Sequence, residues 1–182
     1  VPFPALDSAK LQYAIKANLH EKKVTLEAFH LKATHQEQPV LVGKINQKMT
    51  FAWGAKTVIA PDSEFQLTVT NTDLADWRPW LGRFAQSGAV TSSVNIDVRQ
   101  AGRKISFGSS GKVADLKLPV GEKIISAGDL QFTTFGQLTD FKKLVFNDLD
   151  VSAGDAAKNY FKFKGDAAVD LPRRTLSGQG SL

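Results

Sequence analysis

Residues 90–107 read VTSSVNIDVRQAGRKISF, and this stretch decides the fold class. Val94, Ile96 and Val98 alternate with polar neighbours, which places the apolar side chains on one face of an extended strand. Residues 100–103 are typical of a tight turn, and the alternation resumes immediately after them. The stretch therefore predicts an antiparallel β-hairpin.

The same period of two recurs through most of the chain. The connections between the alternating segments are short, which favours antiparallel pairing of neighbours. The apolar set changes phase near Ala28-Phe29, so a β-bulge is expected there. We predict an all-β fold in which residues 1–182 form one domain, an elongated and curled antiparallel sheet that is either an open groove or a sandwich. Further strands are expected over residues 11–19, 24–33, 45–53, 65–69, 113–118, 124–135, 138–151, 160–171 and from 175 onward.

One short α-helix is predicted near residues 72–81. Asp73 is a suitable cap for its first turn, and Leu74, Trp77, Trp80 and Leu81 have the spacing of one helical face. Two roles are open for Trp77, Trp80 and Leu81: they anchor the helix on the sheet, or they insert at a membrane interface, where indole rings are favoured.

Composition excludes several classes of protein. With 42% apolar and 23% charged residues, the 182-residue chain is too apolar for intrinsic disorder and too polar for a bundle of membrane helices. Zero cysteines exclude a disulfide framework, thiol catalysis and thiolate metal sites. The net charge of +5 favours an anionic partner. We interpret the chain as a segment of a longer protein.

Catalytic and metal-binding patterns are weak throughout. His20, His30 and His35 fall on different parts of a predicted hairpin and its loop, so no metal site is expected. Ser109 and Lys112 have the spacing of an acyl-transfer pair, but that pair operates on a helix, whereas glycines at 108 and 111 are expected to interrupt a strand here. The basic residues are scattered without an aromatic platform, which argues against nucleic acid. We expect no enzyme activity and no cofactor.

Two stretches resemble a known family. Residues 147–151, Asn-Asp-Leu-Asp-Val, and the closing phrase over residues 165–182 are similar to the bacterial AsmA-like family, the AsmA/TamB-type periplasmic β-groove proteins. The resemblance covers residues 65–182 best, and it includes no catalytic motif. It implies a segment of a larger cell-envelope protein in the periplasm that is anchored in the inner membrane. It further implies phospholipid transport between membranes or a part in outer-membrane assembly.

The predicted apolar face suggests how such a protein would act. An uncovered apolar sheet face shields acyl chains from water, so phospholipid or another acyl lipid is the expected partner. The alternative function is a scaffold or adhesion module that binds envelope proteins through exposed strand edges. The candidates for the groove wall are Leu11, Tyr13, Ile15, Leu19, Phe65, Leu67, Val69, Val94, Ile96, Val98, Ile105 and Phe107.

Overall fold

The computed structural model describes residues 6–54, 58–77, 81, 84–155 and 158–182. They form one antiparallel sheet of eleven strands, so the predicted all-β class is confirmed. The strands are β1 (Ser8–Asn18), β2 (Lys23–His35), β3 (Gln38–Ile45), β4 (Met49–Ala52), β5 (Ser63–Asp73), β6 (Ser87–Arg99), β7 (Lys104–Val120), β8 (Lys123–Thr139), β9 (Lys143–Gly154), β10 (Asn159–Asp170) and β11 (Thr175–Ser181).

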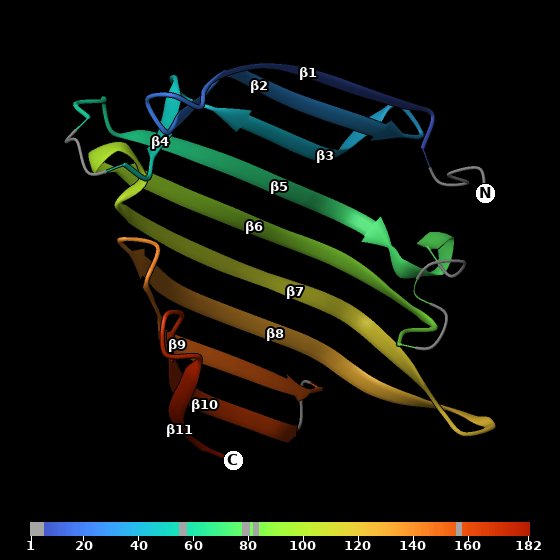
Figure 1. Ribbon diagram of the computed structural model, residues 1–182. Helices are drawn as coiled ribbons and strands as arrows, with labels where there is room; N and C mark the ends of the chain where they lie inside the picture. Colours follow the sequence, from blue (N-terminus) through green and yellow to red (C-terminus); the bar gives the residue numbers. More distant parts are fainter. Residues whose placement is uncertain (1–5, 55–57, 78–80, 82–83, 156–157) are drawn as a thin grey trace.

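The strands follow one another across the sheet almost in chain order. The order is β1-β2-β3-β5-β6-β7-β8-β9-β10-β11, and β4 pairs with the first residues of β2 beside β3. Figure 1 shows β1 and β11 at opposite edges of this sheet. The sheet is neither closed nor strongly curled. Of the two predicted forms, the sandwich is wrong, because the described strands make a single layer. The curl expected of the sheet is weak.

Register places the apolar side chains on one face. Residues that pair directly across antiparallel strands point to the same side, and residues two apart in a strand share that side. A row of direct pairs crosses all ten strands of the main path, and alternation extends it along each strand; we call this side the apolar face. The row is Leu11, Leu31, Gly43, Leu67, Val94, Ser109, Thr134, Leu149, Gly165 and Gly180.

A β-bulge keeps the apolar side chains of β2 on that face. Ala14 pairs with Ala28, but the next residue, Ile15, pairs with Leu26, so Glu27 is the extra residue. Without it the apolar residues of the first half of β2 would point to the opposite side. The bulge predicted near Ala28-Phe29 is confirmed one residue earlier.

The predicted α-helix at 72–81 is wrong in its first half. Thr72 and Asp73 still belong to β5 and pair with Val90 and Ala89 of β6. A 3-10 helix, η1 (Leu74–Trp77), follows. Asp73 does act as a cap, since its Oδ1 accepts a hydrogen bond of 2.8 Å from the Ala75 N–H. Residues 78–80, and with them Trp80, lie outside the described residues.

Buried side chains gather at the two ends of the strands. At one end the segment after β5 covers the sheet, where Ala85, Val113 and Leu116 form a small core. At the other end β4 contacts the second 3-10 helix, η2 (Gln100–Gly102). Gly102 has φ +86°, and a Cβ there would lie 2.9 Å from the Phe51 ring. The apolar face between these ends has no covering layer among the described residues.

Candidate functional site

The apolar face holds almost all of the predicted groove residues. By register and alternation, every predicted groove residue except Leu19 lies on this face, in β1, β5, β6 and β7. Leu19 lies in the turn after β1. The structure therefore brings these residues onto one surface, and their contact with lipid stays a prediction.

Exposure varies across this face. Leu11 and Ile15 are 55% and 59% exposed, and Tyr13 is exposed beside them. Phe65, Leu67, Val94, Ile96, Ile105 and Phe107 are half-buried. Val98 is only 1% exposed and belongs to the core. The apolar side chains of this face are therefore most exposed at the β1 edge, and they remain partly exposed across the centre of the sheet.

Aromatic rings lie over glycines on this face. A Cβ on Gly111 would lie 2.6 Å from the Phe132 ring, and one on Gly136 would lie 2.7 Å from Phe107 Cε2. Phe163 covers Gly180 in the same way. Each of these glycines therefore leaves room for a neighbouring ring to lie against the backbone.

Ring contacts link strands that lie on either side of one intervening strand, and a few hydroxyls interrupt the apolar surface. Phe29 and Phe65 make an edge-to-face pair with centroids 5.5 Å apart, and Phe107 and Phe146 make another at the same distance. Ser92, Ser109 and Thr134 are the small polar residues at the centre of the face. Apart from them, the central surface offers ring and aliphatic carbon.

An apolar pocket of about 240 Å³ opens at the η1 end of the apolar face. Trp77 and Leu81 form one wall, and strand residues form the other. Two of the three predicted anchor or membrane-interface residues thus line this pocket, Trp80 lies outside the described residues, and both predicted roles stay open. The sequence reasoning missed this pocket because its walls come from segments far apart in the chain. The lining residues are Leu6, Val40, Leu41, Val69, Thr72, Leu74, Trp77, Leu81 and Val90.

A larger and more polar pocket of about 750 Å³ adjoins it. His35 Nε2 lies 3.9 Å from Asp76 Oδ2, and His35 Nδ1 is buried without a hydrogen-bond partner among the described residues. His20 lies in the turn after β1 and His30 lies within β2, so the three histidines do not converge. No group of three metal-ligating side chains occurs in the described part of the chain.

Ion pairs lie on the opposite, polar face. Lys112 lies beside Asp129 and lowers the pKa of that carboxyl, and the Asp115 N–H adds a hydrogen bond of 3.1 Å to the same side chain. Asp150, at 2.9 Å, raises the pKa of Lys164. These pairs are solvent-exposed, and Lys164 lines an open pocket of about 400 Å³ together with Asp148 and Asp166.

Among the described residues, no helix has the length and apolar character needed to cross a membrane. Comparison of the chain with known protein families, with curated proteins and with solved structures gives no match.

Proposed function

We propose that this chain is a non-catalytic lipid-binding domain that holds acyl chains on its apolar face. The observation that carries the proposal is a single open sheet with one predominantly apolar, partly exposed face running across ten paired strands. Soluble monomers rarely leave apolar patches larger than a few hundred Å² in water. A face of this extent is therefore best explained by an apolar occupant.

The dimensions of the face suit acyl chains. Ten strands at about 4.8 Å spacing span roughly 43 Å. One leaflet of a bilayer has a hydrocarbon thickness of about 15 Å, half of the roughly 30 Å core. A lipid tail laid across the strands would therefore contact several of them at once.

The chemistry of the face also suits a ligand without hydrogen-bonding groups. Backbone groups in the centre of the sheet are paired in the ladder, and rings such as Phe107 and Phe132 cover the glycines beside them. Each methylene transferred from water onto such a surface gains about 0.8 kcal/mol. Because headgroups stay in solvent at the open side, binding needs little headgroup recognition. In a bacterial envelope, this surface would serve phospholipid transport or outer-membrane assembly.

Native mass spectrometry of the purified domain tests this function, followed by organic extraction of whatever is bound. We expect phospholipid or another acyl lipid to co-purify at a reproducible stoichiometry. The delipidated domain should take up a fluorescent phospholipid added from a detergent-free dispersion. A stable, lipid-free monomer that takes up none of the added lipid would overturn the proposal.

A second candidate function rests on the open edges of the sheet. Within the part of the chain that the structure describes, β1 pairs only with β2, and β11 pairs only with β10. Such edges accept an added strand from a partner, so a scaffold that binds envelope proteins is the alternative. Ser177→Pro together with Gln179→Pro is expected to weaken strand addition at β11 and to leave lipid uptake unchanged. If strand addition at β11 is unchanged in this variant, the scaffold alternative loses its support and the apolar face is favoured as the only functional surface.

A further inference from the structure

Charge is divided between the two ends of the strands. Because the strands of the main path alternate in direction, their connections lie alternately at the two ends of the sheet, and the connections on both sides of β4 lie at the same end. Counting the described connections and the strand residue on either side of each, one end has ten basic and four acidic residues. We call it the basic end. Its basic residues are Lys22, Lys23, Lys48, Arg99, Arg103, Lys104, Lys142, Lys143, Arg173 and Arg174, and its acidic residues are Glu21, Asp62, Asp140 and Asp170.

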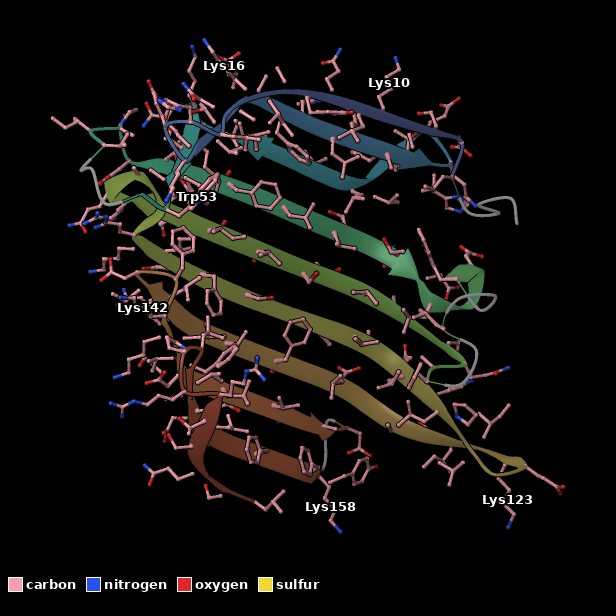
Figure 2. The ribbon with its side chains drawn as sticks, in the orientation of Figure 1. Lys10, Lys16, Trp53, Lys123, Lys142 and Lys158 are labelled. Atoms are coloured by element: carbon pink, nitrogen blue, oxygen red, sulfur yellow. The ribbon has the colours of Figure 1, made fainter. Side chains whose placement is uncertain are left out.

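The opposite end has the reverse balance. Counted in the same way over the described residues, it has five acidic and two basic side chains, and Asp7, just before β1, adds a sixth acidic one. Figure 2 shows Lys142 at the basic end, and Lys123 and Lys158 away from it. Among the described residues, the excess of basic over acidic side chains is thus found at one end of the strands. The residues of this acidic end are Asp7, Glu37, Asp73, Asp76, Glu122 and Asp155, with Lys123 and Lys158.

The charges at this end are only partly balanced within the sheet, since four of the ten basic residues form ion pairs. Arg99 and Lys104 are direct cross-strand partners, and like charges in that position are destabilising. Lys143 continues the same row two strands further on, with Thr139 between. Glu21 lies 2.9 Å from Lys23, but the Arg99–Asp62 distance is 3.8 Å. No ion pair within the described residues involves Lys22, Arg103, Lys104, Lys142, Lys143 or Arg174.

Exposed apolar side chains accompany the basic ones. Ile59, in the connection between β4 and β5, is 97% exposed, and Leu19, in the connection between β1 and β2, is 74% exposed. Trp53, Phe141 and Leu171 lie in connections at the same end and are also exposed. Figure 2 shows Trp53 at the same end of the strands as Lys142. Basic side chains mixed with indole and aliphatic groups are the composition of surfaces that lie in a membrane interface.

We infer that the basic end docks on an anionic lipid bilayer. Lys and Arg would lie at the phosphate level, and Leu19, Ile59 and Trp53 would enter the boundary between headgroups and acyl chains. A nucleic acid is the less favoured partner, because aliphatic groups such as Ile59 gain nothing from its solvated backbone. The exposed aromatic side chains named above also form no stacking row across the turns, so the bilayer is favoured. This inference goes beyond the proposed function, since docking of a bilayer and retention of single lipids are separate events.

The expected strength follows from the number of charges. Each basic residue near an anionic surface changes binding by about fivefold, so removing three lowers the partition coefficient about a hundredfold. The attraction falls within a Debye length of about 8 Å at physiological salt, and binding should therefore weaken steeply as salt is raised.

Vesicle sedimentation with the full 182-residue chain tests the charge dependence. We expect binding to vesicles of phosphatidylcholine with 30% phosphatidylglycerol, roughly, and little to phosphatidylcholine alone. The triple variant Lys142→Gln, Lys143→Gln, Arg174→Gln should lose about a hundredfold in partitioning. The matched control, Lys117→Gln, Lys123→Gln, Lys158→Gln, removes the same charge elsewhere and should bind as the parent does. Equal losses in the two variants would overturn the assignment to the basic end.

A site-specific label tests insertion independently. The chain has no cysteine, so Ile59→Cys and Val120→Cys each give one labelling site for an environment-sensitive dye. Val120 is exposed at the acidic end. On addition of anionic vesicles, the emission maximum of the dye at position 59 should shift to the blue, and that of the dye at position 120 should not. The inference would be overturned if the emission of the dye at position 59 does not shift. It would also be overturned if the chain retains RNA and does not bind the vesicles. If the chain docks on vesicles but retains no lipid, the proposed function is contradicted and the docking inference stands.

Discussion

Replacing two exposed apolar residues of β1 is the sharpest test of the apolar face. Leu11 and Ile15 lie on this face at the edge of the sheet, and Leu11→Ser together with Ile15→Ser removes their aliphatic groups without adding charge. We expect this double variant to fold and to retain lipid poorly. It should still dock on anionic vesicles, because neither residue lies at the basic end.

The magnitude follows from the exposure of the two side chains. Complete burial of a leucine or isoleucine side chain is worth about 1.5–3 kcal/mol. At 55% and 59% exposure, somewhat more than half of each is left for a ligand to cover. Each residue then contributes on the order of 1 kcal/mol to lipid binding, and the pair lowers affinity by about thirtyfold. The half already packed on the sheet gives a comparable loss in the free energy of unfolding, about 2 kcal/mol for the pair.

A control with the same stability loss separates the two effects. Val98 is 1% exposed, so Val98→Ala is expected to cost about 2 kcal/mol of stability while removing no surface that a ligand reaches. Affinity for a fluorescent phospholipid is measured by titration well below both unfolding midpoints, which thermal denaturation supplies. Equal affinity in the double variant and the parent would refute the role of the β1 edge in lipid binding. Equal losses in the double variant and Val98→Ala would show that stability alone is responsible.

Three further outcomes test the local structure. Gly136→Val should lower the free energy of unfolding by about 1–3 kcal/mol in denaturant titrations, because its Cβ would lie 2.7 Å from Cε2 of Phe107, inside van der Waals contact with the ring. Lys112→Gln should raise the pKa of Asp129, which NMR titration measures. In the parent protein, the pair contributes its full stabilisation above the ordinary carboxyl pKa, and this stabilisation is lost as the pH falls through the lowered pKa of Asp129. Asp73→Ala removes the cap of η1 and should cost about 1 kcal/mol in thermal unfolding, with no change if the cap is irrelevant.

The strand pattern was predictable wherever strict alternation coincided with a polar turn. Residues 90–107 form the predicted hairpin, with Ile96 paired to Phe107 and Val98 paired to Ile105. Every predicted groove residue within a strand is on one face because a period of two needs no knowledge of the partner strand. Leu19 follows the same alternation in the sequence, but the chain turns just before it.

Errors arose where distant partners decide the local structure. The spacing of Leu74, Trp77 and Leu81 indicates a helix, but pairing of Thr72 and Asp73 with β6 extends β5 into the predicted helix. Tertiary pairing outweighs helix propensity here, because ladder hydrogen bonds with β6 replace those of a first helical turn.

Glycines and turn residues were misleading in a similar way. Residues 108–111 suggest a break, yet β7 runs through them, because the ring of Phe132 fills the space above Gly111. The turn before β9 lies at 140–142, later than expected, because Asp140 and Phe141 adopt positive φ without glycine. Neither the covering ring nor the φ values are visible in the local sequence.

The division of charge depends on topology and therefore emerges only from the fold. Lys22, Arg103, Lys142 and Arg174 are spread over more than 150 positions and look scattered in the sequence. Antiparallel order brings alternate turns to one end, so these residues share a surface that no local motif marks.

The apolar face and the basic end become related once the direction of the strands is considered. A 17-residue strand such as β7 rises roughly 56 Å from the basic end to the other end. If the basic end rests on a bilayer, the strands stand away from the membrane and the apolar face begins at its surface. Acyl chains leaving the bilayer would then meet Phe51 and Ile105 before the centre of the sheet. Docking would thus place the lipid-binding surface where lipid leaves the membrane, although each property is tested separately.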